Sequence, residues 1–281
     1  RTVTGVQTCA LPIYLNKNSF GGRSAVTCYT CHQGSVEPAK TFSFASASEK
    51  NEMEPEQETA SIPGVEQILT SYEKALGGAD ALNKINSRVT KGISVDMNNR
   101  ETPIEIIQDR SGKYLSSMTI REGMTSTRAF NGKTGWMIGP RGTRELPPQM
   151  SNELKNEARL STIDELRDLS KTLHFQETAQ VNGTQAYVLS SPSGDHQSVQ
   201  YYFDAGSGLL VRKVVTIETM VGDIPKQTDY SDYRVVDGVK LPFLVKNLSV
   251  DSHEYFIRTI SSIQHNVPVD EKRFEMPPAK K

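Results

Sequence analysis

The chain has 281 residues, of which 36% are hydrophobic and 23% charged, a balance that suits one large or two small globular domains. Its formal net charge is −1 and its pI is about 6.6, and no basic stripe stands out, so nucleic-acid binding is not expected. No stretch approaches the roughly 18 consecutive apolar residues that a membrane-spanning helix needs.

Residues 1–13 are expected not to belong to the biological protein. The sequence VTGVQTCALPI at positions 3–13 matches the forward translation of a common sequencing-library adapter. A short apolar strand or the end of a signal peptide is the alternative interpretation. If the segment is an adapter, Cys9 is not a native cysteine, and the natural chain continues upstream of Tyr14.

The next segment, residues 14–40, carries a C-x-x-C-H motif at Cys28, Cys31 and His32. Two thiols at this spacing can each add to a vinyl group of one haem, and the adjacent histidine can then supply an axial imidazole to the iron. A zinc site would need two further Cys or His ligands at matching spacing. A thioredoxin-type redox pair would need the motif to open a helix after a buried strand. The motif favours covalent haem over these two alternatives.

The residues around the motif, NSFGGRSAVTCYTCHQG at positions 18–34 followed by Pro38, resemble the haem-attachment segment of the photosynthetic reaction centre cytochrome c subunit family. The resemblance covers residues 14–40 and implies one covalent haem c. In that family the distal iron ligand is a methionine on a helix upstream of the motif, whereas this sequence has no methionine before Met53. The segment is therefore interpreted as the C-terminal remnant of a c-type haem domain.

Residues 41–63 are predicted to be a flexible acidic linker. They are rich in Ser, Ala and Glu and nearly lack apolar side chains after Phe44. Such a composition cannot bury enough apolar surface to offset the chain entropy lost on folding. For the same reason Met53 is not expected to hold a fixed position as an iron ligand.

Residues 64–277 are predicted to form one globular α+β domain that begins with helices. Apolar residues recur at helical spacing between Val65 and Leu76, and Gly77-Gly78 ends the pattern. A short helix is expected at residues 80–85, and a further helical segment between Pro147 and Leu173.

The rest of this domain is predicted to be an antiparallel sheet. Many segments alternate polar and apolar residues, as in QTDYSDYRV at positions 227–235, and turn signals such as Asn182-Gly183 and Asp237-Gly238 separate them. The expected strands are 88–97, 104–109, 114–121, 126–130, 135–138, 186–190, 198–203, 209–218, 227–234, 239–249 and 254–263.

Four segments of the domain resemble outer-membrane lipoprotein-sorting (LolA-like) proteins. They are ALGGADALNKI at 75–85, NGKTGW at 131–136, YFDAGSGLLV at 202–211 and DYRVVDGVKLP at 232–242. The resemblance implies a curved, incomplete antiparallel barrel closed by a helical lid, with an apolar cavity that can hold acyl chains. It implies that the helices at 64–85 and 147–170 form the lid and that Trp136 lines or supports the sheet. The alternative is that the apolar residues fill a solid core.

The domain offers no recognisable catalytic motif, and we expect no enzymatic activity. The patterns G-x-S-x-G, H-E-x-x-H, G-x-G-x-x-G and the P-loop are absent from the sequence. Ordinary surface or half-buried positions, without a second ligand at metal-binding spacing, are expected for His174, His196, His253 and His265. Solvated positions without a catalytic role are expected for Asp164, Glu165, Asp229 and Asp232.

These features predict a haem-binding periplasmic electron-transfer protein, that is, a c-type cytochrome fragment with an appended LolA-like domain. Its cofactor would be one haem c held by Cys28, Cys31 and His32, with His32 as the metal ligand. Its partners would be redox proteins of a photosynthetic or respiratory membrane chain, and the missing N-terminus could attach it to the membrane. The alternative is a periplasmic carrier or sensor of lipid, lipoprotein acyl chains or another hydrophobic ligand.

Overall fold

The computed structural model describes residues 10–19, 62–121, 124–139, 142–192, 197–219, 222–249 and 255–277. Residues 10–19 form helix α1 (Ala10–Ser19), which continues across the predicted end of the adapter segment at residue 13. The predicted linker and the C-x-x-C-H motif lie outside the described residues. Among the helices that are described, none combines the length and hydrophobicity that would let it span a bilayer.

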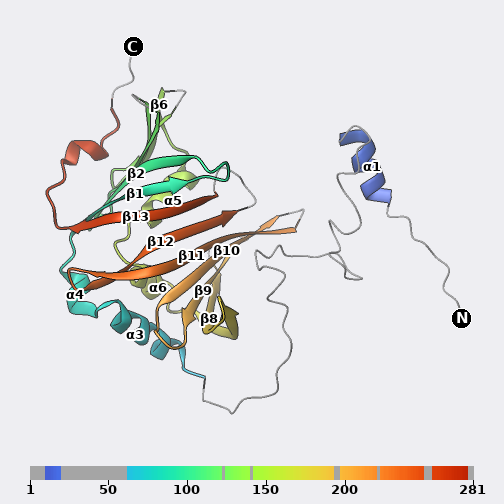
Figure 1. Ribbon diagram of the computed structural model, residues 1–281, viewed down its shortest axis with the longest axis vertical. Helices are drawn as coiled ribbons and strands as arrows, with labels where there is room; N and C mark the ends of the chain where they lie inside the picture. The colour runs from blue at the N-terminus through green and yellow to red at the C-terminus, as the bar shows by residue number, and fades with distance from the viewer. Residues whose placement is uncertain are drawn as a thin grey trace, which may run out of the picture. The chain divides into compact units, whose positions relative to one another are not determined.

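Thirteen strands form a single open sheet with the order β6-β5-β4-β3-β2-β1-β13-β12-β11-β10-β9-β8-β7, and the α+β fold class predicted from the sequence is confirmed (Figure 1). The strands are β1 (Ser87–Val95), β2 (Glu101–Asp109), β3 (Tyr114–Arg121), β4 (Met124–Phe130), β5 (Gly135–Gly139), β6 (Gly142–Glu145), β7 (His174–Val181), β8 (Thr184–Pro192), β9 (Gln197–Asp204), β10 (Leu210–Thr219), β11 (Gly222–Val236), β12 (Val239–Ser249) and β13 (Phe256–His265).

The chain enters this sheet in the middle and leaves it in the middle. It runs outward from β1 to the edge strand β6, crosses to the opposite edge at β7, and returns strand by strand to β13, which pairs antiparallel with β1. Figure 1 shows β1 and β13 side by side. This pairing places Arg88 opposite His265, 177 residues further along the chain. Contacts that no local sequence pattern encodes therefore form the centre of the sheet.

Helices cover the inner face of the curved sheet at both ends, as the predicted lid requires. The helices α3 (Val65–Leu76) and α6 (Thr162–Asp168) pack on β8, β9 and β10 in one apolar cluster, where the rings of Tyr72 and Phe203 meet edge to face with centroids 5.2 Å apart. The helix α5 (Pro148–Glu157) packs on β3 and β4 through Leu154 and Ala158. Helix α4 (Ala79–Asn83) follows α3 after a turn at Gly77, whose φ is 120°.

The C-terminal segment covers part of the outer face. Successive side chains of a strand point to opposite faces, so Val89 and Ile107 point away from the inner face, which is lined by their neighbours. Phe274, in the 3-10 helix η2 (Glu271–Phe274), is 0% exposed in the outer cluster, and its carbonyl accepts a 2.7 Å hydrogen bond from Trp136 Nε1. Trp136 therefore supports the sheet from outside and does not line the inner face.

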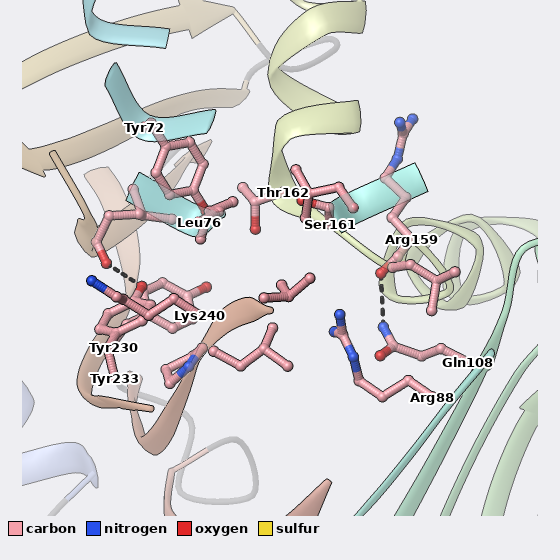
Figure 2. A pocket seen from close by; sticks show the side chains of 16 residues that line it. Tyr72, Leu76, Arg88, Gln108, Arg159, Ser161, Thr162, Tyr230, Tyr233 and Lys240 are labelled. Atoms are coloured by element: carbon pink, nitrogen blue, oxygen red, sulfur yellow. Dashed lines mark hydrogen bonds between the residues drawn. The ribbon is translucent and has the colours of Figure 1, made fainter. Parts of the chain in front are cut away.

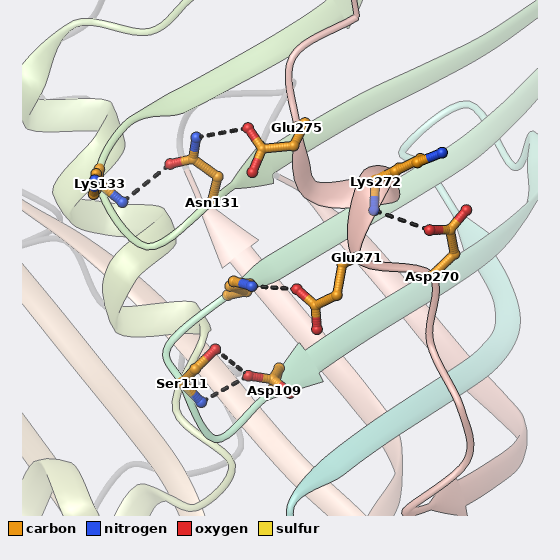
Figure 3. Close-up of polar contacts among 9 residues, drawn as sticks. Asp109, Ser111, Asn131, Lys133, Asp270, Glu271, Lys272 and Glu275 are labelled. Atoms are coloured by element: carbon orange, nitrogen blue, oxygen red, sulfur yellow. Dashed lines mark hydrogen bonds and ion pairs between the residues drawn. The ribbon is translucent and has the colours of Figure 1, made fainter.

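Polar contacts fix the same segment to the turns of the sheet, as Figure 3 shows. Glu271 forms an ion pair with Lys113, and Glu275 accepts a 3.4 Å hydrogen bond from Asn131. Asp270 caps the 3-10 helix by accepting a 3.0 Å hydrogen bond from the backbone N–H of Lys272. The C-terminal segment thus covers the outer face over β2, β3 and β4.

Candidate functional site: a cavity on the inner face of the sheet

The inner face is hollow between the two ends that the helices cover. A cavity of about 780 Å³ lies over β1, β2, β3, β11, β12 and β13, with α5 along one side. The alternation of side chains along a strand explains its lining, because Arg88 and Thr90 of β1 and Ile106 and Gln108 of β2 all point inward. Its volume lies within the range of roughly 300–1,000 Å³ that is usual for small-molecule sites.

One wall of the cavity is apolar. Ile106 and Met118 come from β2 and β3, and Ile260 and Ile263 come from β13 on the other side of β1. Aromatic side chains at other points of the lining are Tyr114, Tyr230, Tyr255 and Phe256. This wall can bind a hydrophobic chain, because moving apolar surface from water onto an apolar wall is favourable.

The cavity also carries charged residues, which corrects the apolar lining that the LolA-like resemblance implied. Five basic side chains line it against three acidic ones. The basic residues are Arg88, Arg100, Arg128, Lys226 and Arg258, and the acidic residues are Asp96, Glu153 and Glu157. Asp96 and Arg100 pair with each other at 3.2 Å in the turn between β1 and β2. Apart from this pair, the lining has four basic and two acidic side chains.

Arg258 is the residue of this group with a buried donor that has no hydrogen-bond partner among the described residues. This donor is its Nε. The guanidinium lies over the ring of Phe256, with its Cζ 3.8 Å from the ring centroid. Burial lowers the pKa of Arg258, and the negative charge of Glu157 acts in the opposite direction. A buried donor without an acceptor costs about 1–3 kcal/mol, which a bound acceptor would recover.

A smaller cavity of about 170 Å³ adjoins the first, and the two share lining residues that include Arg88, Gln108 and Tyr230 (Figure 2). The Arg88 guanidinium points into it from the sheet, opposite Ser161 and Thr162 at the start of α6. Burial lowers the pKa of Arg88 to about 10. The two cavities thus form one hollow region with the half-buried cation Arg88 at their junction.

Hydrogen bonds attach the helices above this hollow region to the sheet. Gln108 Nε2 donates to the backbone carbonyls of Glu157 at 2.7 Å and Arg159 at 2.8 Å, at the C-terminal end of α5. Lys213 of β10 binds both carboxylate oxygens of Glu165 in α6, at 2.7 and 2.9 Å. The sequence predicted that Glu165 lies on a solvated face of its helix. Instead, its ion pair with Lys213 anchors α6 to the sheet.

Two further residues differ from their predicted surroundings. Asp229 was predicted to be solvated, but its side chain is 18% exposed and pairs with Arg212 at 2.7 Å. The side chain of His265 is 1% exposed and lies between Arg88 and Asp237. Asp232 does face solvent, where it pairs with Arg234 at 2.7 Å. The contacts of Asp229 and His265 could not be inferred from spacing, because their partners lie on other strands or in a turn, whereas Arg234 is only two residues from Asp232 on β11.

Comparison with solved structures gives the fold a name. A LolA superfamily protein from Nitrosomonas europaea matches with a TM-score of 0.51 at 11% identity, covering 76% of this chain and 98% of that one. An outer membrane lipoprotein-sorting protein domain from Vibrio parahaemolyticus matches with a TM-score of 0.50 at 13% identity, covering 74% and 96%. No protein-family model and no curated protein matches the chain. The sheet domain therefore has the LolA-like fold.

These findings correct the sequence-based description of the protein as a photosynthetic, metal-binding cytochrome c. The solved structures that match it have the LolA-like fold, and no group of three or more His, Cys, Asp or Glu residues that could hold a metal occurs among the described residues. Cys28, Cys31 and His32 lie outside the described residues, so the covalent haem stays a prediction from the motif alone.

Proposed function

We propose that this protein is a periplasmic carrier that holds an acyl chain or another hydrophobic ligand in its inner-face cavity. The observation that carries the proposal is the cavity of about 780 Å³ with its wall of Ile106, Met118, Ile260 and Ile263. The likeness to a lipoprotein-sorting protein domain supports both the ligand class and the periplasmic location. The proposal is one of binding and release, with no chemical step.

The energetics of the cavity suit such a ligand. Each methylene group moved from water to an apolar wall contributes about 0.8 kcal/mol, and association costs at least roughly 4 kcal/mol of lost freedom. A chain of about ten carbons contributes about 8 kcal/mol, which is of the same order as that cost. The apolar cluster of α3 and α6 and that of α5 lie at the two ends of the inner face and flank the hollow region.

Binding of the neutral fluorescent probe N-phenyl-1-naphthylamine to the full chain tests the proposal. We expect saturable binding of the probe, and we expect dodecanoate to displace it. Met118→Trp should weaken probe binding at least roughly tenfold, because the larger side chain takes up cavity space and a few methylenes of lost contact are worth several kcal/mol. Thr119→Trp is the matched control, since Thr119 is the next residue of β3 and is exposed. Absence of saturable binding, or equal effects of the two substitutions, would contradict the proposal.

A further inference from the structure

We infer that the ligand is an anionic amphiphile whose carboxylate or phosphate head group binds the guanidinium of Arg258 while its chain lies along the apolar wall. The inference rests on the proposed function and adds to it the chemical class of the head group. It also assigns a role to a half-buried cation whose Nε is buried without a partner among the described residues.

The position of Arg258 on its strand is unusual for a charged residue. Phe256, Arg258 and Ile260 are alternate residues of β13, and all three line the cavity. An arginine between two hydrophobic residues on an inward face has to be desolvated when the protein folds, at a cost of several kcal/mol unless partners compensate. The ring of Phe256 compensates in part through its contact with the face of the guanidinium.

That stacking does not use the in-plane N–H groups of the guanidinium. A cation–π contact uses the flat face, whereas the N–H groups lie in the plane and form the fork that fits a carboxylate or phosphate. The Nε has no acceptor in the described residues, as its burial without a partner shows. An anionic head group is the acceptor whose charge and geometry match this donor.

The charges near Arg258 do not already neutralise it. Burial lowers the pKa of Arg258, and Tyr114 and Glu157 oppose this effect only in part. Arg128 adds a second positive charge that lowers the pKa of Arg258. Over the whole lining, five basic side chains face three acidic ones, and an anionic head group would reduce this excess of positive charge.

The apolar wall begins beside this group. Ile260 follows Arg258 on the inward face of β13, and Ile263 and Met118 extend the wall along and across the sheet. A chain attached to a head group at Arg258 can therefore lie on these residues without crossing a polar surface. A free inorganic anion would leave this wall unused, so the two parts of the site together select an amphiphile.

The test compares four competitors for displacement of N-phenyl-1-naphthylamine from the full chain at pH 8: dodecanoate, dodecyl phosphate, dodecanol and inorganic phosphate. We expect the wild-type protein to bind at least one of the two anionic amphiphiles roughly tenfold or more tightly than dodecanol. The Arg258→Gln variant should lose roughly ten- to hundredfold in affinity for that amphiphile and about twofold or less for dodecanol.

Arg234→Gln is the matched control, because Arg234 also lies over a phenylalanine ring, that of Phe243 at 4.6 Å, but is 56% exposed and outside the cavity. It should leave all affinities unchanged. Equal affinity of the wild-type protein for dodecanol and the anionic amphiphiles would overturn the inference about the head group. The carrier function would remain supported in that case, and this comparison requires no variant. Displacement by inorganic phosphate as tight as by dodecyl phosphate would also overturn it. Failure of the wild-type protein to bind any of the amphiphiles would instead contradict the carrier function.

Discussion

The Nε of Arg88 donates a 3.3 Å hydrogen bond to Nε2 of His265, across the pairing of β1 with β13. The other ring nitrogen of His265, Nδ1, lies 3.1 Å from a carboxylate oxygen of Asp237. Since Nε2 accepts from a cation, the imidazole is neutral and its proton lies on Nδ1. The neutral histidine thus holds the half-buried Arg88 at the junction of the two cavities. Protonation of His265 would remove the acceptor of this hydrogen bond.

The stability of the protein should depend on the ionisation of His265. Burial and the positive charge of Arg88 lower the pKa of His265 below 6.5, although Asp237 acts in the opposite direction. The unfolded chain therefore binds this proton more readily than the folded one, so this contribution to stability is complete above pH 6.5 and is lost as the pH falls through the folded-state pKa.

Urea unfolding at a series of pH values between 7.5 and 5 checks this prediction. We expect the free energy of unfolding to fall on acidification in the wild-type protein and in His174→Gln, whose histidine is exposed. In His265→Gln the fall should be smaller, because the titrating group is gone. Parallel pH profiles for the wild-type protein and His265→Gln would show that the ring does not titrate with folding.

Gly77→Ala should destabilise the protein by about 2 kcal/mol or more, because it adds a methyl group where backbone atoms already meet. Gly77 ends α3 with a φ of 120°, and a Cβ at this position would collide with the carbonyl oxygen of Gly238 in the turn between β11 and β12. Gly206→Ala is the control, since Gly206 is exposed and a Cβ there meets nothing closer than 3.6 Å. Thermal unfolding followed by circular dichroism measures both, and equal melting temperatures would contradict the prediction.

Trp136→Phe should cost about 1–3 kcal/mol, because the buried carbonyl of Phe274 loses its 2.7 Å hydrogen bond from the indole. The loss should loosen the C-terminal segment and leave the inner face unchanged. Hydrogen exchange at residues 270–277 should therefore accelerate, whereas displacement of N-phenyl-1-naphthylamine should be unaffected. Unchanged exchange in this segment would mean that the Trp136 contact does not hold it in place.

Local sequence patterns predicted most strands of the domain and missed two. The ranges of β3 and β12 were predicted exactly, because alternation and turn residues mark both ends. The edge strands β6 and β7 were missed for a physical reason. The sequence GTRE of β6 has no apolar side chain, and β7 is largely exposed, so backbone pairing forms these strands without the burial that a pattern reveals.

The candidate site was only partly predictable. The LolA-like resemblance implied a cavity, but the guanidinium of Arg258 in its lining was missed, although the segment FIRTI at 256–260 carries the signal. Arg258 lies between Phe256 and Ile260 on the face of its strand that points inward. Once the orientation of the strand is known, a charged residue at such a position indicates a functional role. That orientation depends on the pairing of β13 with β1, which lies about 170 residues away in sequence and leaves no local trace.

Photo-crosslinking tests most directly whether the inner-face cavity holds an acyl chain. The full chain would be irradiated with a dodecanoate that carries a diazirine on its chain, digested, and analysed by mass spectrometry. We predict labelling of residues 114–121 and 256–265, the strands β3 and β13 that form the apolar wall, and loss of that labelling with excess unlabelled dodecanoate. Labelling confined to the outer-face segment at residues 267–277, or labelling that excess ligand does not reduce, would contradict the account.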